Sequence, residues 1–399
     1  MSEISTHQYD KAQILHALFH AVMQRNDAVN QIKAAKTAIE NAGPYDIIDL
    51  VDKLMSENIP LAQLKTGVNK FLNVLGNTIR KLPEVQAGEG SFVWLLQQNN
   101  LLLSEKLTRF KTLVKALNNT PNLAGLWQKA AEDLNEIAAF EAYYTIKENV
   151  LFPVIEKHWT NYRCTQLMWS FHDDIRNSLQ RLATIIASPN PDLQQFNKSV
   201  GDLYFTMLAI RLRDEKLLFP QILASIPGAA LDRLLQDCHD PELPFVKAPE
   251  TPHKTTAETP GSPEFIDLST GSLTAAQLLL LFNHLPVDIT YVDEFDKVRF
   301  FSSPPHRIFP RSRAIIGRDV HQCHPPESVD IVHRIIEGFR SGRKSEASFW
   351  IKMKQKVILI RYFALRDTDG TYKGVIEVSQ EISEIQQLKG EQRLLDWED

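Results

Sequence analysis

The chain is poor in cysteine and has no long hydrophobic run. Its 399 residues include 3 cysteines, which lie far apart without a Cys-x-x-Cys pair, and this excludes a disulfide framework and the common structural zinc patterns. Purely apolar runs are short, as in Leu278–Phe282, so no segment is long enough to cross a bilayer. Residues 1–5 lack the basic stretch and apolar segment of a secretory signal. We therefore expect a soluble, cytoplasmic protein without a membrane partner.

The chain also lacks a large excess of one charge and the common catalytic motifs. Lys and Arg number 44 against 49 Asp and Glu, a net charge of -5, so no overall basic field favours nucleic acid as a partner. Hydrophobic residues make up 43% and charged residues 23%, which excludes a disordered or collagen-like chain. No glycine-rich phosphate loop, Gly-x-Ser-x-Gly elbow or HExxH pair occurs. We expect a protein that is not an enzyme and has no catalytic residues.

Prolines mark the clearest domain boundary. Six of them interrupt residues 240–264, and because proline has a fixed φ and no N–H, this stretch is predicted to be a semi-extended linker. Apolar residues before it repeat at three- and four-residue intervals, which predicts helices. Residues 1–83 are expected to form a small helical domain, in which the sequence shows no residue cluster that suggests chemistry.

Four long helical segments are predicted between residues 90 and 238. They cover Phe92–Leu117, Leu123–His158, Cys164–Ala187 and Asp192–Leu223, and their short connections favour an up-and-down four-helix bundle. A sequence echo supports two equivalent faces around one core, because an acid is followed three residues later by Leu-Phe-Pro on alternate helices. The two copies are Glu148–Pro153 and Glu215–Pro220.

After the linker the pattern changes to alternating strands and short helices. Five β-rich runs predict a five-stranded antiparallel sheet within residues 270–382, and they are Val287–Val292, Val298–Phe301, Phe349–Met353, Val357–Leu365 and Tyr372–Gln380. Residues 383–399 are predicted to form a polar C-terminal helix that helps the chain to dimerise. The expected fold class is multidomain, with an all-α part followed by an α+β domain.

Several local motifs make the C-terminal part resemble a PAS sensor domain. They are His284–Asp293, Ile316-Gly317-Arg318, Cys323-His324-Pro325-Pro326 and Asp369–Tyr372. The whole chain resembles a bacterial and archaeal family that joins a small helical domain, a hemerythrin-like (HHE cation-binding) four-helix bundle and a C-terminal PAS domain. This resemblance implies a sensor of small molecules or redox state, with a small-molecule ligand, a protein partner of unknown identity and a homodimeric assembly.

The bundle keeps the hemerythrin-like framework but loses most of its metal ligands. Family members usually carry histidine or glutamate at positions that here hold other residues, namely Ser91, Trp94, Asn99 and Tyr143. The remaining donors are chiefly Glu148, His172 and the acidic pair Asp214-Glu215, and one imidazole with a few carboxylates does not complete a two-iron site. We therefore predict a metal-free pseudo-site, in which a buried His172 is hydrogen-bonded to Glu148 or Glu215.

The PAS-like part offers its own candidate ligand residues, which are Cys323, His324 and Trp350. Cys323 and His324 could serve as a redox-active thiol and an axial haem ligand, or they could simply precede a helix that starts at Pro326. The aromatic strand residues, Trp350 among them, could line a ligand pocket or only pack the core. A local cluster of Arg307, Arg311, Arg313 and Arg318 fits either a solvated face or an anion-binding surface.

These observations lead to two main hypotheses and a weaker third. The first is a non-catalytic cytoplasmic signalling protein, whose PAS domain binds a small molecule or senses redox state while the bundle is a structural or partner-docking module. The second is a gas- or redox-sensing metalloprotein, with haem in the PAS domain or iron in the bundle. The third is an oxidoreductase or an iron–sulfur repair enzyme.

Overall fold

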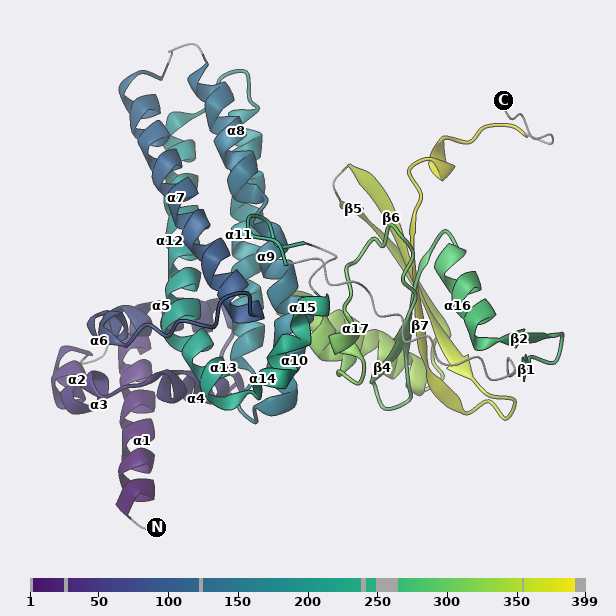
Figure 1. The fold of residues 1–399 in the computed structure, drawn as a ribbon, viewed down its shortest axis with the longest axis horizontal. Helices are drawn as coiled ribbons and strands as arrows, with labels where there is room; N and C mark the ends of the chain where they lie inside the picture. Colours follow the sequence, from purple (N-terminus) through teal and green to yellow (C-terminus); the bar gives the residue numbers. More distant parts are fainter. Residues whose placement is uncertain are drawn as a thin grey trace. The chain divides into compact units, whose positions relative to one another are not determined.

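The computed structural model describes residues 3–24, 28–121, 125–237, 242–248, 265–353 and 355–391. The chain divides into two compact units, residues 1–251 and residues 252–399, and each is described by itself (Figure 1). No helix in these described ranges is long and apolar enough to span a membrane.

The first unit begins with six helices: α1 (Glu3–Gln24), α2 (Ala28–Ala34), α3 (Lys36–Glu40), α4 (Pro44–Met55), α5 (Leu61–Val74) and α6 (Gly76–Lys81). The start of α4 follows from its sequence. Pro44 occupies the first helical position, where a missing N–H costs nothing. The Asp46 carboxylate accepts the Gly43 N–H at 2.8 Å. These two features fix the residue at which α4 begins.

Four rods of helix follow and lie side by side as a bundle (Figure 1). The first is α7 (Phe92–Asn119) and the third is α11 (Cys164–Ile186). The second contains α8 (Leu126–Ala138), α9 (Glu141–Ile146) and α10 (Phe152–His158), and the fourth contains α12 (Leu193–Arg213) and α13 (Phe219–Ser225). Two short helices, α14 (Gly228–Asp232) and α15 (Leu234–Asp237), come after the fourth rod. The all-α part of the predicted fold class is confirmed.

Matched π-helical turns interrupt the second and fourth rods. They are η1 (Lys147–Leu151) and η2 (Asp214–Leu218), and each is followed closely by a proline, Pro153 or Pro220. Proline has no N–H and its ring clashes with the carbonyl four residues earlier, so a regular α-helical turn cannot form there. The Phe152 N–H bonds to Lys147 O and the Phe219 N–H to Asp214 O, both across five residues. The sequence echo therefore corresponds to a repeated widening of the helix, a feature frequent at functional sites.

The N-terminal helices and the bundle share one hydrophobic core, which extends from Leu15 to Leu243. The expected boundary near residue 83 therefore does not separate two cores. Polar contacts also join the parts, because the Asp52 carboxylate accepts the Arg163 backbone N–H at 2.7 Å and pairs with its guanidinium at 2.9 Å. Residues 1–237 thus form one packed helical body over their described ranges.

Part of the expected linker is packed onto the bundle instead of extending from it. The Asn99 side chain, 0% exposed, accepts the N–H groups of Phe245 (2.9 Å) and Val246 (3.2 Å) and donates to the Val246 carbonyl at 3.0 Å. The amide serves both as acceptor and as donor in these contacts. Within the predicted linker, residues 245–246 are therefore fixed to the bundle. Residues 240–241 and 249–264 lie outside the described residues.

The second unit contains the predicted five-stranded antiparallel sheet, in the order β4-β3-β7-β6-β5. Its strands are β3 (Asp288–Val292), β4 (Val298–Phe301), β5 (Glu346–Met353), β6 (Lys356–Arg366) and β7 (Tyr372–Glu381). Helices α16 (Ala275–His284) and α17 (Pro326–Arg340), a two-stranded ribbon of β1 (Phe265–Asp267) and β2 (Ser272–Thr274), and the 3₁₀ turns η3 (Arg313–Ile315) and η4 (Val320–Cys323) complete it. The α+β part of the fold class is thereby confirmed.

The predicted C-terminal helix is not formed in its described part. Strand β7 runs to Glu381, and only a single 3₁₀ turn, η5 (Ile385–Gln387), follows before residue 391. The Ser383 N–H bonds to the Glu381 side chain at 2.8 Å and the Ser383 hydroxyl to the Val357 N–H at 2.8 Å, which fixes a turn rather than a helix start. Residues 392–399 lie outside the described residues.

Gly374 provides a test of how closely β7 approaches β3. Its φ is +120°, and an added Cβ would lie 2.0 Å from the Val292 carbonyl oxygen. We expect Gly374→Ala to lower the free energy of unfolding of the second unit by about 3 kcal/mol or more, because strain and a backbone clash combine. In the matched Gly370→Ala variant, also at positive φ but with nothing within 4 Å of the added Cβ, about 1 kcal/mol is expected. Urea unfolding of the full chain measures both, and equal losses would contradict the close approach.

Candidate functional site

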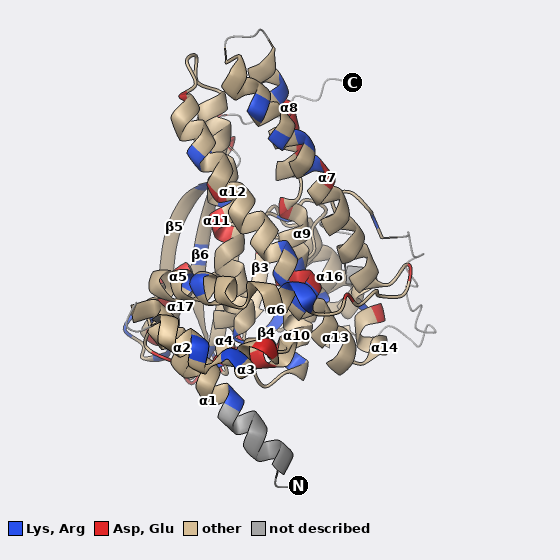
Figure 2. Ribbon diagram, turned by 90° about the vertical axis from the view of Figure 1, so that its left-hand side faces the viewer, with Lys and Arg blue, Asp and Glu red and all other residues tan. Residues whose placement is uncertain are grey.

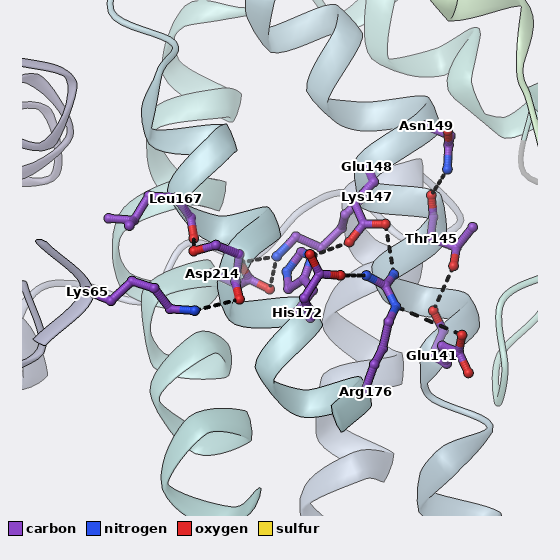
Figure 3. A network of polar contacts seen from close by, with 12 residues as sticks. Lys65, Glu141, Thr145, Lys147, Glu148, Asn149, Leu167, His172, Arg176 and Asp214 are labelled. Carbon is purple, nitrogen blue, oxygen red and sulfur yellow. Dashed lines mark hydrogen bonds and ion pairs between the residues drawn. The ribbon is translucent and has the colours of Figure 1, made fainter. Parts of the chain in front are cut away.

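A network of buried charges lies where the two π-helical turns face each other inside the bundle (Figure 3). Lys147 opens η1 and Asp214 opens η2, and both side chains are 0% exposed. The Lys147 ammonium lies 2.6 and 2.7 Å from the two Asp214 oxygens, and the Tyr143 hydroxyl donates to Asp214 at 2.9 Å. A cation, a carboxylate and a phenol thus bond directly to one another in the interior.

A second set of contacts is centred on Glu148, which lies between His172 and Arg176 in Figure 3. Its Oε1 is 2.8 Å from His172 Nδ1 and its Oε2 accepts from Arg176 at 2.8 Å. Arg176 also donates to Asp173 at 2.8 Å. The Tyr144 ring stacks on the imidazole with 4.4 Å between ring centroids. Glu148 therefore has both oxygens engaged, and His172 is held flat against an aromatic wall.

Burial controls the protonation of this network. It raises the pKa of Glu148 to about 7 although Arg176 opposes the shift, and it lowers the pKa of His172 well below its ordinary value, so the imidazole is neutral. Burial also lowers the pKa of Lys147 and raises that of Asp214, while the attraction between the two charges opposes both shifts. A neutral imidazole can accept from a protonated Glu148 or donate to an ionised one, so the contact persists in either state.

The structure brings together only part of the predicted pseudo-site. His172 and Glu148 are in contact as one of the two predicted alternatives requires. Glu215 is not part of the network, because its carboxylate is half-buried and pairs with Arg211 at 2.9 Å. Sequence reasoning named Asp214 only as part of an acidic pair with Glu215, and it missed Lys147 and the pairing of Lys147 with Asp214. Their signal was the echo itself, since they occupy equivalent positions one residue before Glu148 and Glu215.

The donor set of the bundle does not fit a two-iron centre. The Asp214 carboxylate is already bonded to the Lys147 ammonium. The Glu148 carboxylate is already bonded to Arg176 and His172. The His172 Nε2 atom is buried and without a hydrogen-bond partner in the described part of the chain, but it is a single imidazole donor. Iron requires several imidazole and carboxylate ligands converging on one point. Fixed positive charges at that place would repel a cation.

The core-facing side of the PAS-like sheet is polar near its centre. Thr290 on β3 pairs across the sheet with Glu377 on β7, which pairs with Tyr362 on β6. These side chains share a face with the core residues Val292 and Val375, which lie two positions along the same strands. Opposed residues of neighbouring strands lie on one face. The sheet thus presents a hydroxyl, a carboxyl and a phenol to the interior of the domain.

Arginine side chains cover this polar face. Arg307, whose side chain is 6% exposed, donates to Thr290 at 3.1 Å and lies 3.9 Å from the Asp288 carboxylate. The Nε atom of Arg311 is buried and has no hydrogen-bond partner among the residues that the structure describes. Burial raises the pKa of Asp288 and Tyr362, and the positive charge of Arg311 opposes both shifts. The guanidinium of Arg311 is thus near enough to Asp288 and Tyr362 for its charge to lower the pKa of both.

The predicted basic cluster divides into buried and exposed members. Arg307 and Arg318 are buried, whereas Arg313 is exposed to solvent. The solvated-face interpretation is therefore wrong for Arg307 and Arg318. A buried guanidinium group is more typical of a site where arginine pairs with an anion or a carboxylate.

The three candidate ligand residues of this domain lie in different surroundings. Cys323 is buried in the core, and its Sγ lies 3.5 Å from the Asp319 carbonyl oxygen. Burial, with the nearby Arg311 charge, lowers the pKa of His324 to about 3, so its ring is neutral. Trp350 is 69% exposed and lies on the opposite face of β5 from the core-packed Phe349. The prediction that Trp350 lines a pocket is therefore wrong.

The interior of the second unit does not fit haem. A porphyrin requires a largely apolar pocket beside its axial ligand. Here the central strands present Asp288, Thr290 and Glu377 to the interior, and Arg307 lies over them. His324 is a neutral imidazole, but a flat apolar macrocycle beside it would bury these charged groups unpaired.

The fold and these two sites define the class of protein: a charge-centred helical bundle followed by an α+β domain with a polar core. Comparisons with known families are more specific. Residues 103–236 match the hemerythrin HHE cation binding domain, and residues 278–383 match a PAS domain. The chain thus combines a hemerythrin-type domain with a C-terminal PAS domain, as the sequence resemblance predicted. These two domain types support a sensory or signalling role.

Similar solved structures cover only part of the chain. A C-terminal domain from Streptococcus mutans is 30% identical over 32% of this chain and 98% of that one, with a TM-score of 0.31. A sensory box sensor histidine kinase from Vibrio cholerae is 19% identical over 27% of this chain and 90% of that one, with a TM-score of 0.21. No curated protein matches the chain.

Removing Lys147 tests the buried ion pair. Lys147→Met leaves Asp214 charged and unpaired, so we expect the free energy of unfolding to fall by about 3–5 kcal/mol. The triple variant Lys147→Met/Asp214→Leu/Tyr143→Phe removes every partner and should recover most of this loss, since an apolar core avoids the desolvation cost. Urea unfolding of the full chain measures both. Lys36→Met, from the exposed Lys36–Glu40 pair at 3.9 Å, is the control and should cost less than about 1 kcal/mol. An unchanged Lys147→Met variant would contradict the argument.

Glu148 predicts a pH dependence of stability. Because burial raises its pKa from 4.5 to about 7, the folded state holds a proton that the unfolded state releases. Its contribution is present below pH 4.5 and is lost as the pH rises through about 7. The stability of the native chain relative to Glu148→Gln should therefore fall by up to about 3 kcal/mol over this range. Unfolding at a series of pH values tests this, and a difference that rises with pH would refute it.

Proposed function

We propose that this chain is a non-catalytic sensory protein, whose PAS domain binds a small polar molecule that carries an anionic group. The observation that carries the proposal is the buried Nε atom of Arg311, which has no hydrogen-bond partner among the described residues. A buried donor without a partner costs about 1–3 kcal/mol, and a bound acceptor would remove this cost. The surrounding hydroxyl and carboxyl groups would orient the same molecule.

The chemistry of the ligand follows from the groups around Arg311. A guanidinium binds a planar carboxylate through two parallel hydrogen bonds, so a small carboxylic acid is the class that fits best. Glu377 and Thr290 lie opposite each other on the sheet and supply an acceptor and a hydroxyl for a polar group elsewhere on the ligand. The interior thus favours a small multi-functional acid over a hydrocarbon or a haem.

The bundle would then serve as a scaffold or a docking module. Its interior charges are paired with one another in the residues that the structure describes (Figure 3). Its outer surface carries both signs of charge (Figure 2), because α7 holds mainly Lys and Arg and the neighbouring α8 mainly Asp and Glu; Lys106 and Arg109 both pair with Glu136, at 2.8 and 2.6 Å. Such a mixed surface favours a protein partner over a polyanion. Homodimerisation and a cytoplasmic location stay predictions.

Ligand binding is tested with three full-length proteins: the native chain, Arg311→Gln, and the exposed control Arg313→Gln. Thermal unfolding is measured against a panel of small mono- and dicarboxylic acids. A ligand at 100 times its Kd stabilises by about 2.7 kcal/mol, so a hit should raise the Tm of the PAS unit by several degrees. The native chain and Arg313→Gln should respond equally, and Arg311→Gln should not respond.

Two outcomes would contradict the proposal. One is a response to an acid that Arg311→Gln retains in full, since the guanidinium would then have no part in binding. The other is a coloured protein, because a Soret band or two irons per chain would favour the metalloprotein alternative. Absorption spectroscopy and elemental analysis of the purified full chain distinguish these cases before any titration.

A further inference from the structure

Two histidines and a glutamate converge in the N-terminal helices, far along the chain from the hemerythrin-type network. His16 and His20 lie one turn apart on α1, and Glu57 lies in the turn after α4. From the sequence we expect no residue cluster that suggests chemistry in residues 1–83, and the convergence of these three side chains makes this expectation wrong. The three residues are separated by up to 41 positions, so only the packing of α1 against α4 brings them together.

The donor atoms of the three side chains meet at one point. His16 Nε2 lies 2.5 Å from Glu57 Oε1, His20 Nε2 lies 3.2 Å from Glu57 Oε2, and the two Nε2 atoms are 3.3 Å apart. Among the described residues, this is the only group of three His, Cys, Asp or Glu side chains with ligand atoms mutually within 4.8 Å. Two imidazole nitrogens so close together would ordinarily repel unless a proton or a cation lies between them.

These separations match those around a small tetrahedral metal ion. Bonds of about 2.0–2.1 Å to nitrogen and oxygen place tetrahedral ligand atoms about 3.3–3.4 Å apart. The two Nε2 atoms, 3.3 Å apart, already have this separation. The Glu57 contacts of 2.5 and 3.2 Å involve its two different oxygens, so the carboxylate would turn to present one of them to the ion. Two imidazoles and one carboxylate are typical ligands of zinc and neighbouring divalent ions.

The surroundings hold the ligands in place and leave the point open to solvent. Leu15 and Phe19 on the same helix are 0% exposed, so the core fixes the rotation of α1. The Phe19 ring meets His20 edge-on at 5.5 Å between centroids. The ligand side chains themselves are 25%, 33% and 29% exposed for His16, His20 and Glu57. An ion could therefore enter from water and keep a water molecule as its fourth ligand.

We propose that His16, His20 and Glu57 bind one divalent metal ion of the zinc class. The ion joins α1 to the end of α4 and stabilises the N-terminal helices against each other. Its three protein ligands and exposed position make it exchangeable, so it responds to the free metal concentration. This site is independent of the PAS ligand and of the hemerythrin-type network, where fixed cations exclude a metal.

The test uses the full-length chain after treatment with EDTA and dialysis. Zn²⁺ is titrated by calorimetry, and Co²⁺ is titrated by visible absorption, where tetrahedral coordination gives intense bands. We expect one Zn²⁺ per chain, tetrahedral Co²⁺ bands, and a higher Tm in the presence of zinc. Glu57→Gln keeps the shape of the side chain but removes its charge, and it should weaken zinc binding by at least about 10-fold, as should His20→Ala.

Matched variants guard against binding at another histidine and against misfolding. His158→Ala removes an exposed imidazole whose Nδ1 bonds the Val154 carbonyl at 2.8 Å, and it should bind zinc like the native chain. Circular dichroism shows whether each variant is folded, and Glu57→Gln is retained as the test if a histidine variant unfolds. The proposal is overturned if the native chain binds no zinc at micromolar concentration, or if Glu57→Gln and His20→Ala bind it as tightly as the native chain.

Discussion

The interior of the bundle depends on the attraction between Lys147 and Asp214, two charged groups that no water reaches. Desolvating either group alone costs several kcal/mol, so each is tolerable only because the other is present. Both charges stand at the start of a π-helical turn, and each turn exists because a proline follows it. The wider turn changes which side chains face inward. Backbone geometry thus places the two charges, and each charge is tolerated in the interior because the other is beside it.

The same arrangement explains how a hemerythrin-type fold persists without a fitting iron shell. In a bundle of this type a metal would hold the four helices together. Here the Lys147 ammonium supplies the positive charge beside Asp214, and Arg176 supplies it beside Glu148. Asn99 holds the backbone of residues 245–246 against the bundle. The bundle is consequently held together by the side chains of Lys147, Arg176 and Asn99. Unlike a bound metal ion, these groups cannot dissociate from the protein. Under the two proposals, responsiveness lies in the PAS domain and in the partly exposed cluster of His16, His20 and Glu57.

Sequence reasoning predicted local structure well and long-range contacts poorly. Helical periodicity and strand alternation indicated the bundle and the five-stranded sheet, because side-chain burial repeats with the period of each element. The contact of His172 with Glu148 was one of two alternatives, and only packing decided between them. Lys147 was missed because a lysine is ordinarily a surface residue. The convergence of His16, His20 and Glu57 depends on how α1 crosses α4, which no local pattern encodes. Trp350 was misplaced because alternation along β5 does not reveal which face is covered.

The amino-acid sequence alone determined the two-part division of the chain, the rods of the bundle, the strand pattern of the PAS domain and the scarcity of imidazole ligands. Each follows from near neighbours in the chain, whose spacing is fixed by covalent geometry. Tertiary structure alone decided which charges are paired, which part of residues 240–264 is packed down, and where three distant ligands meet. These depend on distances between separate elements, and such distances arise only when the elements pack into one core.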